Sequence, residues 1–180
     1  MKQIALLIII IITGCNTEYD YSFPEVLTRQ IDHYAVNDTI YFKSNTNDLD
    51  TIAVTDRISE ITRGTGFYPP QNDMGIMIHD LPLAKGEHNY KRKHAFVFLK
   101  KYGDDSYLNI RYKGFLEMLK LKDLEGKGDI ITIKTSKPQQ QLTPETIIEV
   151  QWSLSRGLLG YTKLSGERYE IVSPNKLHMR

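Results

Sequence analysis

Hydrophobic and polar residues alternate along most of the chain from Asp38 onward, in runs separated by clusters of Gly, Asn, Asp and Pro. Successive side chains of a strand point to opposite faces of a sheet, so a period of two residues predicts antiparallel β structure. The predicted strands cover residues 39–44, 51–58, 94–101, 107–113, 115–122, 130–134, 148–154, 158–164 and 167–172.

The first two strands are expected to form a hairpin, because the polar segment Asn45–Asp48 between them is typical of a turn. In the second strand, Ile58 and the later Ile61 would fall on opposite faces of a regular strand. A β-bulge adds one residue to a strand and shifts the facing of every residue that follows. We therefore expect a bulge near Ser59 and Glu60.

The C-terminal part predicts a β-meander. Val150, Trp152 and Leu154 alternate with polar residues and should face the core. Turns are expected at Arg156–Gly157 and at Ser165–Gly166, where a two-residue loop suits a hairpin.

Only the segment 24–34 has a helical pattern. Val26, Leu27, Ile31 and Tyr34 would share one helical face, and Pro24 is placed to start the helix.

These elements predict a single all-β domain over residues 24–173, with about eight to ten antiparallel strands and one short N-terminal helix. An open barrel and a two-layer sandwich both satisfy the pattern. Residues 174–180 form a short C-terminal tail.

The composition excludes several classes of protein. Of 180 residues, 25% are charged and 41% are hydrophobic, which argues against a disordered tail and against a polytopic membrane protein. The formal net charge of +1 provides no general field for attracting nucleic acid, so we expect no nucleic-acid partner.

The N-terminus carries an unbroken apolar run, Ile4–Ile12, behind the single positive charge of Lys2. A membrane-spanning helix needs about 20 apolar residues, so this run is too short to cross a bilayer. An apolar run of this length behind a basic start is typical of a cleaved export signal.

The run ends in Ile12-Thr13-Gly14-Cys15, which resembles the lipobox of bacterial lipoproteins. The resemblance implies a signal peptide over residues 1–14, cleavage between Gly14 and Cys15, and acylation of Cys15 with diacylglycerol and usually a further acyl chain. Residues 15–23 would then be the lipidated cysteine and a tether. Cys15 is the only cysteine, so lipidation would leave no disulfide in the fold.

The segments Val150–Tyr161 and Ser165–Tyr169 resemble the closing strands of small, mostly uncharacterised lipoproteins of Gram-negative envelopes. The resemblance implies a lipid-anchored envelope protein with a β fold, most often at the outer membrane and facing the periplasm or the cell surface. It implies no particular activity.

Two surface features are candidate binding sites. The segment Gly64–Gly75 is predicted to be a loop of about twice the usual ~4–6 residues, and it carries aromatic rings beside polar groups that could bind a protein or glycan partner. The loop residues considered are Phe67, Tyr68, Asn72 and Asp73. Alternatively, the two aromatic rings plug the open end of the sheet.

The second feature is the basic run Lys91, Arg92 and Lys93, which could face anionic lipid headgroups or acidic glycans. A strand edge protected by solvated lysines is the alternative.

The sequence gives no positive sign of a metal, a cofactor or a catalytic centre. The five histidines, His33, His79, His88, His94 and His178, form no compact metal-binding pair. No GxSxG motif is present, and lipidation would consume the only thiol. We therefore expect neither a metal nor another cofactor, and incline against an enzyme.

The leading hypothesis is a lipid-anchored envelope protein that acts by binding or as a structural partner. The alternative is a lipocalin-like carrier of a hydrophobic ligand, and a third is an envelope hydrolase. A carrier would have an elongated apolar cavity lined by Phe96, Phe98, Leu108, Ile110 and Trp152.

Overall fold

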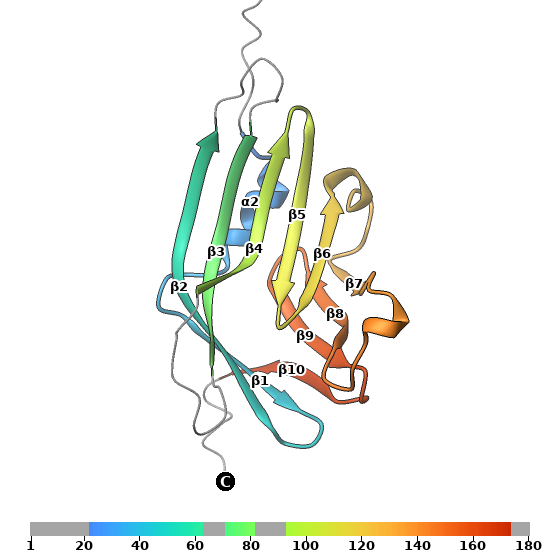
Figure 1. Cartoon of the computed structure of the whole chain (residues 1–180). Helices are drawn as coiled ribbons and strands as arrows, with labels where there is room; N and C mark the ends of the chain where they lie inside the picture. Colours follow the sequence, from blue (N-terminus) through green and yellow to red (C-terminus); the bar gives the residue numbers. More distant parts are fainter. Residues whose placement is uncertain (1–21, 63–70, 82–92, 174–180) are drawn as a thin grey trace, which may run out of the picture.

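A computed structural model describes residues 22–62, 71–81 and 93–173. Ten antiparallel strands form one sheet that curls into a nearly closed barrel, so the all-β prediction is confirmed in its open-barrel form (Figure 1). The strands are β1 (Thr39–Ser44), β2 (Leu49–Thr62), β3 (Gln71–Leu81), β4 (Lys93–Tyr102), β5 (Asp105–Tyr112), β6 (Phe115–Lys120), β7 (Ile130–Lys134), β8 (Ile147–Ser153), β9 (Gly157–Lys163) and β10 (Arg168–Val172). Two short 3₁₀ turns, η1 (Leu121–Asp123) and η2 (Gln139–Gln141), lie in the connections beside β7.

Neighbouring strands follow the order β6-β5-β4-β3-β2-β1-β10-β9-β8-β7. Most neighbours are consecutive in the chain, and the pairing of β1 with β10 joins the two halves of the sheet. The edge strands β6 and β7 do not pair with each other among the described ladders. The seam between them is bridged by a side chain, because the Ser136 N–H donates to Glu117 Oε1 at 2.5 Å.

The helix α2 (Glu25–Asp32) lies behind β3 and β4 in Figure 1 and packs against β4. Leu27 and Ile31 are fully buried and belong to the same core as the strands, as predicted. Val26, predicted on that face, is 40% exposed, and Gln30 is buried instead. The buried face of the helix is therefore rotated slightly from the predicted one, so that it includes Gln30 and excludes Val26.

A buried amide explains that rotation. Trp152 Nε1 donates to Gln30 Oε1 at 2.8 Å, and Gln30 Nε2 donates to the Leu154 carbonyl at 2.6 Å. Each buried polar atom of the Gln30 side chain thus has a partner, as burial requires. Tyr34, which follows the helix, packs edge-on against Phe96. Its hydroxyl oxygen accepts a hydrogen bond from the Leu158 N–H at 2.8 Å.

The bulge in β2 lies earlier than the sequence predicts. The β2–β3 register shifts between Val54 and Asp56, rather than near Ser59 and Glu60. No bulge turns Ile61 toward the core, and its side chain is 55% exposed.

A second bulge lies in β4. Ile76 pairs with Val97 and Met77 pairs with Ala95, so Phe96 is the extra residue. Phe96 and Val97 are neighbours in sequence, and both are fully buried. The bulge explains this, because an extra residue interrupts the regular alternation of faces.

Candidate functional site

The sequence-predicted site residues fall largely outside the described part of the chain. This applies to Gly14 and Cys15 at the expected lipidation site, to Phe67 and Tyr68 of the expected loop, and to Lys91 and Arg92 of the basic run. Lys93 begins β4, but its side chain is outside the described part.

Asn72 and Asp73 lie in a strand, which corrects the predicted loop Gly64–Gly75. Residues 71–75 belong to β3 and pair with both β2 and β4. Asn72 is buried, whereas Asp73 faces Lys100 across the β3–β4 pair with 3.7 Å between Asp73 Oδ2 and Lys100 Nζ. Burial raises the pKa of Asp73, and the charge of Lys100 opposes that shift.

The residues expected to line a carrier cavity are packed into the core instead. Phe96, Leu108, Ile110 and Trp152 have no exposed surface, and the Phe96 ring lies 6.4 Å from the Trp152 ring. Phe98 is only partly buried. It alternates with buried neighbours, so it lies on the outer face of the sheet.

The wall of the barrel opens between β4 and β5. Their ladder runs from the Tyr102–Asp105 pair only as far as the Val97–Ile110 pair. Beyond that point β4 continues paired with β3 alone, and β5 continues paired with β6 alone. The bulge at Phe96 lies where the two strands part, and a bulged strand bends at the bulge. The bulge thus accounts for the opening.

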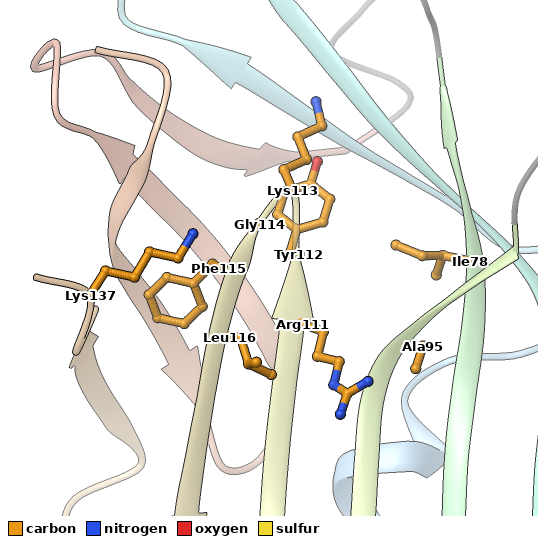
Figure 2. A pocket seen from close by; sticks show the side chains of 9 residues that line it. All are labelled: Ile78, Ala95, Arg111, Tyr112, Lys113, Gly114, Phe115, Leu116 and Lys137. Carbon is orange, nitrogen blue, oxygen red and sulfur yellow. The ribbon is translucent and has the colours of Figure 1, made fainter. Parts of the chain in front are cut away.

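This opening contains a cleft of about 560 Å³. Its lining residues are Ile78, Ala95, Arg111, Tyr112, Lys113, Gly114, Phe115, Leu116 and Lys137. In Figure 2 the β5–β6 turn lies between Lys137 on one side and Ile78 and Ala95 on the other. The volume is within the ~300–1,000 Å³ typical of pockets for small molecules.

A tight turn shapes the rim of the cleft. Lys113 and Gly114 connect β5 to β6 with φ values of 44° and 79°. Two successive positive φ values are typical of the type I′ hairpin turn, whose twist matches that of the strands. Glycine adopts this conformation freely, whereas for Lys113 it is unfavourable.

Asp50 holds Lys113 in place. The Lys113 Nζ donates to Asp50 Oδ1 at 2.6 Å, and the Thr51 N–H donates to the same oxygen at 3.0 Å. The hydroxyl groups of Tyr112 and Tyr161 both donate to Asp50 Oδ2. Asp50 is 5% exposed, so one buried carboxylate receives donors from β2, β9 and the end of β5.

The two tyrosines remain donors at physiological pH. Burial is the main cause that raises the pKa of Tyr112 and of Tyr161, and the interaction of each with Asp50 raises it further. Their rings lie 5.3 Å apart in an edge-on arrangement. The cluster of Asp50, Tyr112, Tyr161 and Lys113, hereafter the Asp50 cluster, therefore joins two lining residues of the cleft to β2 and β9.

A second polar group lies on the β9–β10 hairpin. Lys163 Nζ donates to Glu167 Oε2 at 2.7 Å, and the Tyr169 hydroxyl donates to Glu167 Oε1 at 2.9 Å. The hydrogen bond from Lys163 is the main cause that lowers the pKa of Glu167 to about 2. The stacked rings of Tyr161 and Tyr169, 4.6 Å apart, connect this group to the Asp50 cluster.

Within residues 22–62, 71–81 and 93–173, no group of three or more His, Cys, Asp or Glu residues could hold a metal ion. His33 is the one histidine whose side chain is described, and it is exposed. No helix in the same ranges is long and apolar enough to cross a membrane.

Sequence reasoning missed both the cleft and the Asp50 cluster. Tyr112 was predicted only as one more residue of an alternating strand. Asp50 stands between the polar turn Asn45–Asp48 and the strand predicted from Thr51, and nothing in its neighbours distinguishes it. The dipeptide Lys113-Gly114 between alternating runs was the one available signal, since it is compatible with a hairpin turn.

Comparison with protein-family models, with curated proteins and with solved structures found no match to this chain.

Proposed function

We propose that this protein is a lipid-anchored component of a bacterial cell envelope and that it acts by binding a ligand in the cleft between β4 and the β5–β6 turn. The N-terminal sequence supports the anchor, because a basic start and a nine-residue apolar run precede Ile12-Thr13-Gly14-Cys15. Multiple acyl chains would hold the protein at the membrane far more firmly than a single chain.

The observation that carries the binding proposal is the break in the β4–β5 ladder. Strands that are adjacent in a sheet normally pair along their shared length, yet this ladder ends at Val97 and Ile110 while both strands continue. The break exposes a concave surface with apolar walls and charged rim groups, which are the features of small-molecule sites.

The packing of the interior favours this cleft over the lumen of the barrel. Rings of Tyr34, Tyr112 and Trp152 surround Phe96 at centroid distances of 5.3, 6.0 and 6.4 Å. A lipocalin-like carrier would need to displace these rings, whereas the cleft accepts a ligand without disturbing them.

Site-specific photocrosslinking in intact cells tests the proposal. A photoreactive amino acid replaces Leu116, which lines the cleft, or Met118, which does not. The two residues are matched, because both lie on β6 and are 51% and 57% exposed. We expect a small-molecule adduct on the peptide that contains position 116 and none on the peptide that contains position 118.

Equal adducts at the two positions, or an adduct at neither, would contradict a ligand site in the cleft. A protein-sized adduct at position 116 would instead indicate a macromolecular partner and would also contradict the small-molecule site.

The anchor is tested separately by metabolic labelling with a fatty acid. Cys15→Ser removes the thiol that the lipobox resemblance identifies as the acylated group. We expect labelled parent protein and an unlabelled, uncleaved variant. Equal labelling of the two would refute the lipobox assignment.

A further inference from the structure

The charged residues that line the cleft all carry the same sign. Arg111, Lys113 and Lys137 are cationic, and the described lining residues include no carboxylate. Like charges repel one another at close range. Cations collected around one concave surface therefore favour an anionic occupant.

Only one of these cations is neutralised by a described residue. Lys113 is paired with the buried carboxylate of Asp50 at 2.6 Å. Among residues 22–62, 71–81 and 93–173, no acidic side chain pairs with Arg111 or Lys137. Two positive charges of the cleft thus have no counter-charge within the described protein.

The walls between these cations are apolar. Ile78, Tyr112 and Phe115 are buried side chains at the inner wall, while Ala95 and the exposed Leu116 extend the apolar surface outward. A purely inorganic anion would leave this surface in contact with water. Burial of an apolar group against it is favourable by about 25 cal/mol per Å².

We propose that the ligand of the cleft is a small anionic amphiphile, with one carboxylate or phosphate group attached to a short apolar body. This inference rests on the proposed function, because it assigns a chemical class to the ligand of that same cleft. The apolar body lies against Ile78, Ala95 and Leu116, and the anionic group is held by Arg111 or Lys137 through charge-assisted hydrogen bonds.

Asp50 affects the charge of the cleft only through Lys113. It fixes Lys113, so the charge of Lys113 is already compensated and contributes little to selection of the anion. Selectivity for an anion should consequently depend on Arg111 and Lys137.

The test is titration calorimetry on the full chain in phosphatidylcholine nanodiscs, with empty nanodiscs as the blank. Four probes share one apolar chain: octanoate, octyl phosphate, neutral octanamide and octylammonium. We expect octanoate or octyl phosphate to bind at least about tenfold more tightly than octanamide, and octylammonium to bind most weakly. The comparison of octanoate with octyl phosphate identifies the preferred acidic group.

The double variant Arg111→Gln and Lys137→Gln should weaken binding of the preferred anion about tenfold or more, and should leave octanamide within about twofold. Added salt should reduce that anion's affinity for the parent protein more than for the double variant. Lys122→Gln, an exposed charge outside the cleft, is the control and should change neither affinity.

The outcomes separate the two levels of the proposal. Equal affinity for octanoate, octyl phosphate and octanamide, all reduced when Leu116→Ser is introduced, would overturn the anionic class and leave the cleft as a binding site. If all four probes bind and neither Leu116→Ser nor the double variant affects their binding, the probes bind outside the cleft. That result would overturn both the anionic class of the ligand and the cleft as a binding site. The absence of binding by any probe would overturn both as well.

Discussion

Among single residues, Asp50 connects β2 with the end of β5, the β5–β6 turn and β9. Its carboxylate is 5% exposed and receives donors from Thr51, Tyr112, Lys113 and Tyr161. A buried charge is tolerated when its oxygens are satisfied in this way, and its removal leaves the partners without compensation. The stability of the rim of the cleft should therefore depend on this one side chain.

Asp50→Asn should lower the free energy of unfolding by about 3 kcal/mol. The substitution leaves Lys113 without its ion-pair partner, and the hydroxyl groups of Tyr112 and Tyr161 lose their charged acceptor. Denaturant unfolding measures the change. Asp104→Asn makes the same substitution at an exposed turn residue and should change little. Equal losses for the two variants would mean that the Asp50 cluster does not stabilise the barrel.

Trp152 is the largest fully buried side chain, and its indole N–H is bonded to Gln30. Trp152→Ala should cost about 3–5 kcal/mol, as deletion of a large aromatic group from a core does. The neighbouring Gln151→Ala should cost little. A similar shift of the denaturation midpoint for both variants would contradict the burial of this face of β8.

At the scale of elements, the second bulge determines where the wall opens. Phe96 is inserted into β4, and the β4–β5 ladder ends one residue later along the strand, at Val97. Periodicity predicted a strand over residues 94–101. It could not locate the bulge, because the extra residue is defined only by the register against β3.

The same limitation explains the errors in β2 and β3. The apparent mismatch of Ile61 suggested a bulge at Ser59 and Glu60, whereas the register shifts at Val54 and Asp56. Asn72 and Asp73 were assigned to a loop on composition. They lie instead in β3, where they pair with β2 on one side and with β4 on the other. Local sequence predicts that strands exist more readily than it predicts their ends.

Gly75 lets β3 and β4 approach closely beside the bulge. A Cβ atom at this position would lie 2.3 Å from Phe98 Cδ2 and 2.8 Å from the Val97 carbonyl oxygen. Gly75→Ala should therefore destabilise the protein by about 1–3 kcal/mol, the usual cost of overpacking. Thermal unfolding checks this, with Gly128→Ala as the control because nothing lies within 4 Å of a Cβ atom there. No loss at Gly75 would contradict the close approach.

The β9–β10 hairpin should give the protein an acid-sensitive contribution to stability. The folded-state pKa of Glu167 is lowered from its usual value of 4.5 to about 2, chiefly by the hydrogen bond from Lys163. A lowered pKa stabilises the fold above the unfolded value, and this stabilisation is lost as the pH falls from about 4.5 to about 2. Glu167→Gln should flatten that part of the stability profile in denaturant titrations. An unchanged slope would contradict the role of Glu167.

For the whole molecule, the distribution of alternating strands and one helix predicted the fold class, because burial of one face of each strand dictates a curved or layered sheet. The sequence did not distinguish a barrel from a sandwich, since that depends on long-range pairing such as β1 with β10. The cleft arises from the same long-range geometry. It combines residues of β3, β4, the β5–β6 turn and Lys137, which no local pattern groups together.

The proposed function places the ligand in the wall of the barrel and not in its lumen. Methyl NMR of the full chain in nanodiscs, titrated with octanoate, octyl phosphate and octanamide, compares the two locations directly. We expect the methyl signals of Ile78, Ala95 and Leu116 to shift with saturation, while those of Leu108 and Ile110, which are fully buried in the core, remain in place. Larger shifts at Leu108 and Ile110 than at the cleft would contradict a site in the wall and favour a carrier with an internal site. No shift at either location would contradict binding altogether.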